Sequence, residues 1–245
     1  MTVADEAVKS GRTGKSGETG CRRPVGFFDS GVGGRCILEA FRRLCPDEDT
    51  RYIADSQNCP YGNKSPEEII ALSDACVRRL LGEDCKLIVV ACNTATAAAI
   101  DYLRAKYPEV PFVGLEPAVK PAALNSKSAV VAILATQGTF NGRLYRETSA
   151  RFAKDTVVLA VVADEFVAMV ERGETSGAKA EEIVRRRIEP LIAAGADHIV
   201  LGCTHFPHLK GLIGKVAAGR AVIVDPSEAV ARRVKAVLEE RGISA

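Results

Sequence analysis

The sequence predicts an α/β protein made of two similar, doubly wound parallel-sheet domains related by pseudo-twofold symmetry. Two observations support this prediction. From Val25 onward, short apolar runs alternate with amphipathic stretches, which is typical of parallel sheets covered by helices on both faces. In addition, the second half of the chain repeats the order of the small-residue motifs that end apolar runs in the first half.

Eight apolar runs are expected to form the strands, because each is short and lies between helical stretches. These runs lie at 25–28, 52–54, 87–91, 112–115, 130–134, 157–162, 199–201 and 222–224. Amphipathic stretches predict helices at 67–81, 94–106, 181–194 and 228–239. A further helix is expected to begin near Cys36, after a glycine-rich turn.

Length and charge exclude several classes of protein. The chain has 245 residues, of which 47% are hydrophobic, and this is enough for a substantial core. Its 33 Lys and Arg residues against 31 Asp and Glu leave a net charge of +2, so we expect no nucleic-acid partner. No apolar run approaches the ~20 residues that cross a bilayer. Residues 1–23 are polar without apolar periodicity, and we expect a disordered tail there.

Eight cysteines are unusual in a chain that has three His and no Trp. They include no C-x-x-C pair, so the spacing typical of a zinc finger or ribbon is absent. A chain of this size needs no disulfides to hold a core, and its first residues include no apolar export signal. We therefore expect a reducing, cytoplasmic environment.

An internal repeat divides the chain. The matched pairs are VGFFDSG (25–31) with VVAILATQG (130–138), and LIVVACNT (87–94) with IVLGCTH (199–205). We expect residues 24–115 together with 225–245 to form the first domain, and residues 116–224 to form the second. Ligands of such sheets bind beyond the carboxyl ends of the strands, where these motifs lie, so the site is expected in the cleft between the domains.

The turn after the first predicted strand is rich in glycine and begins with a carboxylate. It reads DSGVGG at 29–34, and Cys36 stands where a dinucleotide-binding turn would have its third glycine. Free N–H groups at the following helix N-terminus favour an anion, so the turn is either an anion cradle or a tight turn without a ligand. Asp29 ends a buried strand and therefore needs a partner or a function.

Cys92 and Cys203 are the cysteines that the sequence singles out. Each ends a predicted buried strand and precedes a predicted helix, where the dipole and free amides lower the pKa of a thiol. Because the two residues belong to the two repeated halves, we expect them on opposite sides of one cleft. Such a pair can remove a proton from one face of a carbon atom and return one to the other face.

Polar residues accompany both cysteines. His205 follows Cys203 by two positions and can exchange a proton with it or orient it. Short polar groups stand at the same strand ends, at Ser30, Asn93, Thr94 and Thr204. An alternative use of Cys203 and His205 is metal binding with His208, although the sequence shows no fourth ligand. The segment with Tyr61 and Gly62 is either a plain loop or a cover over the ligand.

These motifs resemble the glutamate racemases of the cofactor-independent aspartate/glutamate racemase superfamily. The resembling segments are FDSGVGG (28–34), CPYG (59–62), ACNTA (91–95), GLEP (114–117), GT (138–139) and LGCTHFP (201–207). Members of that family interconvert L- and D-glutamate by a two-thiol mechanism and supply D-glutamate for bacterial peptidoglycan. The resemblance implies the same isomerase activity here, with no metal. No lysine marks a Schiff-base site at a strand end, so no cofactor is expected.

The resemblance also implies roles for individual residues. Cys203 would remove the proton from L-glutamate, and Cys92 would return one on the other face. The implied substrate contacts are Asp29, Ser30, Tyr61, Gly62, Asn93, Thr94, Thr204 and His205. Asp29 and His205 would also tune the thiols, and Glu171 falls where the family has an acidic helper, although Ala163-Asp164 replaces the Cys-Pro pair that precedes it in many members.

Two other functions remain open on the sequence. A racemase for aspartate or another small amino acid would share the two cysteines and the architecture. A non-catalytic thiol protein, acting as a redox sensor or a metal binder, would use Cys92 and Cys203 near His205. A homodimer is expected only because it is the commonest symmetric assembly.

Overall fold

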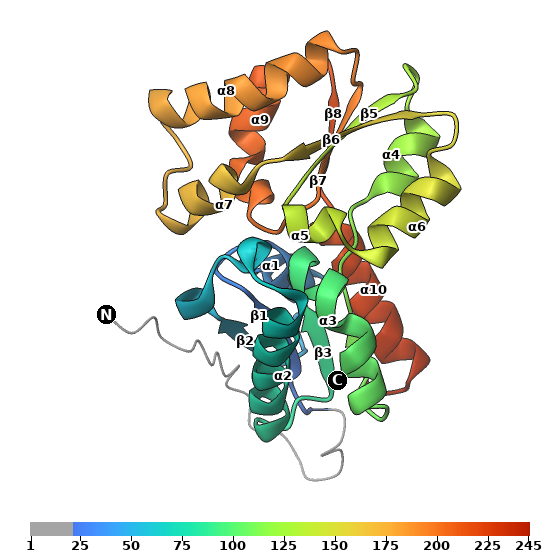
Figure 1. Ribbon diagram of the computed structural model, residues 1–245. Coiled ribbons are helices and arrows are strands. Elements are labelled where there is room, and N and C mark those ends of the chain that lie inside the picture. The colour runs from blue at the N-terminus through green and yellow to red at the C-terminus, as the bar shows by residue number, and fades with distance from the viewer. Residues whose placement is uncertain (1–21) are drawn as a thin grey trace.

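Eight strands form two parallel sheets of four within residues 22–245, the part of the chain that the computed structural model describes (Figure 1). The strands are β1 (Val25–Asp29), β2 (Thr50–Ala54), β3 (Leu87–Val90), β4 (Phe112–Val113), β5 (Val130–Ala135), β6 (Val157–Val162), β7 (His198–Leu201) and β8 (Val222–Val224). Each lies where an apolar run predicts a strand, and the α/β class with two parallel sheets is confirmed. The tail predicted at 1–23 falls mostly on residues 1–21, which lie outside the described residues.

The two sheets have the same strand order. It is β2-β1-β3-β4 in the first sheet and β6-β5-β7-β8 in the second, so the first strand of each half pairs with both of the strands that follow it. In the first sheet, Phe27 of β1 is level with Tyr52 of β2 and with Val89 of β3. Strand β5 lies in the same way between β6 and β7. Because helices cover both faces, the central strands are continuously apolar rather than alternating.

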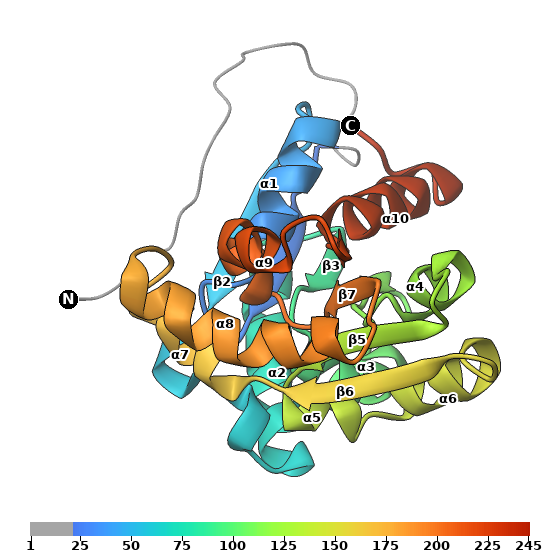
Figure 2. The same cartoon turned by 90° about the horizontal axis from the view of Figure 1, so that it is seen from above.

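Helices cover both faces of each sheet (Figures 1 and 2). Within residues 22–245 the α-helices are α1 (Arg35–Leu44), α2 (Pro66–Gly82), α3 (Asn93–Lys106), α4 (Val119–Asn125), α5 (Gln137–Phe140), α6 (Arg143–Phe152), α7 (Asp164–Glu171), α8 (Ala178–Ala193), α9 (Lys210–Ala217) and α10 (Ser227–Glu240). The 3-10 helices there are η1 (Ser56–Asn58), η2 (Tyr61–Asn63) and η3 (Phe206–Leu209). Helices α1 and α10 pack on one face of the first sheet and α2 and α3 on the other, whereas α7, α8 and α9 cover one face of the second sheet and α4 the other.

The last helix, α10, packs on the first sheet although strand β8 before it belongs to the second. Leu238 of α10 is buried in a cluster with Phe27 of β1 and Phe41 of α1. Figure 1 shows α10 in red beside the blue and green elements of the first half. This packing favours the predicted domains, although their boundaries stay a prediction.

Several helices of the second half are absent from the sequence prediction. Helices α4, α5, α6, α7 and α9 have only four to ten residues each. A segment of this length shows fewer than three turns of apolar periodicity, which is too little to distinguish a helix from a loop. No helix within residues 22–245 combines the length and the apolar character needed to cross a membrane.

Replacing Leu238 by alanine should lower the free energy of unfolding by about 2–5 kcal/mol, because it leaves a cavity between α10 and the first sheet. The matched control is Leu124→Ala in α4, where the leucine is 66% exposed. That change should alter the free energy of unfolding by no more than about 0.5 kcal/mol. Urea denaturation followed by circular dichroism measures both, and equal losses would contradict the packing of α10.

Candidate active site

A small pocket lies where the strand ends of the two sheets meet. Its lining residues come from both halves of the chain: Ser30, Pro60, Tyr61, Gly62, Cys92, Asn93, Thr94, Thr136, Val167, Cys203, Thr204 and His205. The cavity between these side chains is only about 10 Å³, close to the space that one water molecule needs. The lining side chains must therefore move apart before a ligand as large as an amino acid can enter.

Cys92 lies at the N-terminus of α3, directly after β3. Its Sγ accepts the N–H of Ala95 at 3.5 Å and lies 3.7 Å from Ser30 Oγ. Burial raises the pKa of the Cys92 thiol, and the nearby charge of Asp29 raises it further. The lowered pKa expected from the helix N-terminus is therefore wrong for Cys92, because burial and a neighbouring carboxylate outweigh the amide hydrogen bond.

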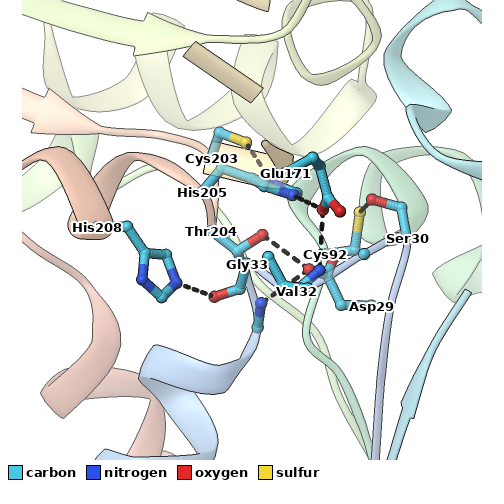
Figure 3. A network of polar contacts seen from close by, with 12 residues as sticks. Asp29, Ser30, Val32, Gly33, Cys92, Glu171, Cys203, Thr204, His205 and His208 are labelled. Atoms are coloured by element: carbon cyan, nitrogen blue, oxygen red, sulfur yellow. Dashed lines mark hydrogen bonds and ion pairs between the residues drawn. The ribbon is translucent and has the colours of Figure 1, made fainter. Parts of the chain in front are cut away.

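Cys203 lies on the other side of the pocket, just after β7. The helix expected to follow it is not directly there, since a turn and the 3-10 helix η3 precede α9. Cys203 Sγ lies 3.7 Å from His205 Nδ1, and His205 Nε2 is hydrogen-bonded to Glu171 Oε1 at 2.6 Å. Glu171 Oε1 in turn accepts the N–H of Val32 at 2.9 Å. Figure 3 shows this chain of contacts running from the thiol of the second half to the glycine turn of the first.

The pKa values of His205 and Glu171 move apart. Burial opposes charge on the imidazole, but its hydrogen bonds to neighbouring thiols and to Glu171 raise the pKa of His205 well above its ordinary value. Burial also opposes ionisation of Glu171, but the hydrogen bonds from His205 and from the Val32 N–H lower its pKa. The pair therefore favours an imidazolium beside a carboxylate.

Asp29 is the neighbour of the other thiol. Its Oδ2 accepts the N–H of Gly34 at 2.7 Å and the hydroxyl of Thr204 at 3.3 Å, so it too joins the two halves. Its Oδ1 has no hydrogen-bond partner of normal geometry, and the Cys92 thiol is close enough to favour the charged carboxylate. Complete burial nevertheless raises the pKa of Asp29. Each thiol thus has its own titratable neighbour, a carboxylate for Cys92 and an imidazole for Cys203.

The glycine-rich turn at 29–34 holds anions that belong to the protein itself. The amides of Val32 and Gly34 donate to the carboxylates of Glu171 and Asp29, so these two donors are not free for an external ligand. A Cβ atom at Gly31 would lie 2.0 Å from Glu171 Oε1. The glycines therefore allow close approach between the two halves, in addition to making the turn.

The remaining predicted contacts line the same pocket. Asn93 is buried, and neither its Oδ1 nor its Nδ2 has a hydrogen-bond partner, so its amide is available to a ligand. Tyr61 is buried beside it on η2, with its hydroxyl donating to Asp55 Oδ2 at 2.6 Å. The hydroxyl of Thr94 lies 2.8 Å from that of Thr136. Ser30, Gly62 and Thr204 complete the set of sequence-predicted residues that the structure brings to the pocket.

Three further lining residues were missed by the sequence analysis: Pro60, Thr136 and Val167. Thr136 had a usable signal, since it occupies the position in the second half that Ser30 occupies in the first. Glu171 and Asp29 do not line the pocket themselves but contact residues that do. Relative to the pocket, Asp29 and Glu171 lie on the far side of the thiols and the imidazole.

The structure does not bring Cys203, His205 and His208 together as the metal-binding alternative requires. His208 Nε2 faces the carbonyl oxygen of Gly33 at 3.3 Å, as Figure 3 shows, rather than the thiol. Within residues 22–245, the possible metal ligands that lie near His205 are Cys59 and Glu171.

Fold and site together define a two-sheet α/β protein with paired thiols placed for acid–base chemistry at one pocket. Residues 35–234 match the family described as Asp/Glu/hydantoin racemase, and the chain belongs to that family.

Similar proteins cover most of the chain. The glutamate racemase of Herpetosiphon aurantiacus is 46% identical over 216 residues, which are 88% of this chain and 85% of that protein. The crystal structure of Escherichia coli glutamate racemase, in complex with L-glutamate and the activator UDP-MurNAc-Ala, is 36% identical with a TM-score of 0.81, covering 89% of this chain and 83% of that one. The structure of the Francisella tularensis glutamate racemase in complex with D-glutamate is 28% identical with a TM-score of 0.79, covering 92% and 84%.

The His205–Glu171 pair should make stability depend on pH. Because the pKa of Glu171 is lowered in the fold, its charge stabilises the protein at pH values above the ordinary pKa of 4.5. This stabilisation is lost as the pH falls through the lowered pKa. Because the pKa of His205 is raised in the fold, its charge contributes fully to stability at pH values below the ordinary pKa of 6.5. This contribution to stability declines as the pH rises toward the raised pKa. His205→Asn should therefore lower the free energy of unfolding most, by about 1.5–3 kcal/mol, between about pH 4.5 and 6.5.

Urea denaturation of the wild type and of His205→Asn between pH 3 and pH 9 measures this difference. His208→Asn is the matched control, because Nε2 of this ring faces the carbonyl oxygen of Gly33 and not a carboxylate. The control should lower the free energy of unfolding by less than His205→Asn over the same pH range. A difference for His205→Asn that does not vary with pH would contradict the ion pair.

Proposed function

We propose that this protein interconverts L- and D-glutamate by a two-thiol acid–base mechanism without a cofactor. The observation that carries the proposal is the placement of Cys92 and Cys203, one from each sheet, at a single small pocket. The family and the similar glutamate racemases support the reaction. The short polar side chains that line the pocket suit a small polar substrate.

In the L-to-D direction, the thiolate of Cys203, whose own proton has passed to His205, takes the α-proton of L-glutamate. An S–H bond forms, and the electron pair of the broken C–H bond stays on the α-carbon. The carbon then takes a proton from the Cys92 thiol on its other face, which leaves Cys92 as a thiolate. His205 and Asp29 exchange protons with the two thiols and orient them, so that the pair can be reset for the next cycle.

The pocket also suits the unstable charge that forms on the α-carbon. Burial excludes water, and fixed polar groups lower the free energy of a carbanion-like transition state without reorganising. The unpartnered amide of Asn93 is placed to bind a carboxylate or ammonium group of the substrate. We assign the other substrate contacts to Ser30, Tyr61, Gly62, Thr94, Thr204 and His205, with Asp29 and Glu171 acting through these groups and the thiols.

We place the reaction in the supply of D-glutamate for bacterial peptidoglycan. Free thiols at the site need a reducing compartment, which favours the cytoplasm. A homodimer is part of this proposal only as the commonest symmetric assembly.

Deuterium exchange at the α-carbon in D₂O tests the reaction and separates it from its alternatives. Exchange into both enantiomers of glutamate is expected. Exchange into aspartate but not glutamate would assign the protein to the other substrate. An absence of exchange into any amino acid, with a titratable dithiol, would favour a non-catalytic thiol protein.

Cys92→Ser and Cys203→Ser should each reduce racemisation by at least about 100-fold, because each removes one of two proton-transfer groups. Circular dichroism follows both the ellipticity of glutamate, which racemisation abolishes, and the retention of the fold. Cys45→Ser is the matched control, since this partly buried thiol lies at the end of α1 and does not line the pocket. Activity close to that of the wild type in either pocket variant would overturn the mechanism.

A further inference from the structure

A third thiol lies beside the His205–Glu171 pair. The Sγ of Cys59, a carboxylate oxygen of Glu171 and a ring nitrogen of His205 all lie within 4.8 Å of one another. Sulfur, imidazole nitrogen and carboxylate oxygen are the three ligand types that Zn²⁺ takes in proteins, at about 2.0–2.3 Å from the ion. The proposed mechanism gives Cys59 no role.

The three side chains come from separate parts of the chain. Cys59 lies between η1 and η2, Glu171 ends α7, and His205 follows β7. Two of them converge over Gly31: a Cβ there would lie 2.0 Å from Glu171 Oε1 and 3.2 Å from Cys59 Sγ. The missing side chain therefore provides the space in which the thiol and the carboxylate approach one another.

The cluster is held in place by its surroundings. Glu171 is fixed by the Val32 N–H, and His205 is 1% exposed. Cys59 and Glu171 are only partly buried, so an ion can reach the group from solvent. A zinc site with three protein ligands leaves a fourth position for water, which is common where the site is not purely structural.

We propose that Cys59, Glu171 and His205 form a binding site for a thiophilic divalent cation such as Zn²⁺, and that occupation of this site inhibits the enzyme. The ion would take the carboxylate and an imidazole nitrogen, and these are the groups that stand behind Cys203. Inhibition rests on the proposed function, whereas binding of the ion does not.

Metal binding to the full chain is the first test. Equilibrium dialysis of metal-free protein against Zn²⁺, with metal analysis, should give one ion per chain in the wild type. Cys59→Ser should weaken this binding by at least about 10-fold, whereas Cys45→Ser should not change it. Co²⁺ should give a thiolate charge-transfer band in the wild type that Cys59→Ser lacks, and Mg²⁺ should not compete, because it prefers oxygen ligands.

Inhibition is the second test. Zn²⁺ should inhibit glutamate racemisation in the wild type with a midpoint that matches the dissociation constant, and Cys59→Ser should need at least about 10-fold more Zn²⁺ relative to its own metal-free rate. Stoichiometric binding that Cys59→Ser keeps and Cys92→Ser loses would overturn the inference in favour of the catalytic thiols. Racemisation that Zn²⁺ does not affect would also overturn it. Zinc binding without racemisation of glutamate would instead reject the proposed function and leave the metal site standing.

Discussion

Close contact between the two halves depends on a turn, DSGVGG at 29–34, in which three of the six residues are glycine. Gly31 faces Glu171, and a Cβ at Gly33 would lie 2.7 Å from His205 Nδ1. Any larger residue at these positions would push α7 and the segment after β7 away from β1. The hydrogen bonds that join the halves, from Val32 to Glu171 and from Thr204 to Asp29, need this approach. The pocket between the two thiols therefore requires glycine at positions 31 and 33, where a Cβ atom would clash with Glu171 or His205.

The two halves are alike in architecture but different in electrostatics. Both sheets have the same strand order, and each contributes a cysteine just after its third strand. The neighbours of the cysteines differ, since Cys92 has the buried carboxylate of Asp29 while Cys203 has the imidazole of His205 supported by Glu171. In the proposed mechanism the carboxylate favours a protonated thiol at Cys92, and the imidazole receives the proton from Cys203. A repeated fold thus surrounds its two cysteines with unlike charged groups.

The sequence was most informative where the signal is local. The eight apolar runs and the small residues that follow them are continuous in the chain, so strands and the positions of Cys92 and Cys203 could be predicted from them. Contacts between the two halves involve residues far apart in the sequence, so no local pattern predicts them. Cys59 meets Glu171 only because α7 lies over Gly31, and Val167 reaches the pocket from the same helix. The thiol pKa failed as a prediction for Cys92 because burial, which a sequence shows poorly, exceeds the effect of a helix N-terminus.

The return of α10 to the first sheet has a consequence for the order of folding. The apolar face that Phe27 and Phe41 present is covered by α10, and this helix is synthesised only after the second half of the chain. The first half is therefore synthesised early but completed late, after the whole second half has been made. Until then its uncovered face is a hydrophobic surface of a partly folded nascent chain, the kind of surface that chaperones bind.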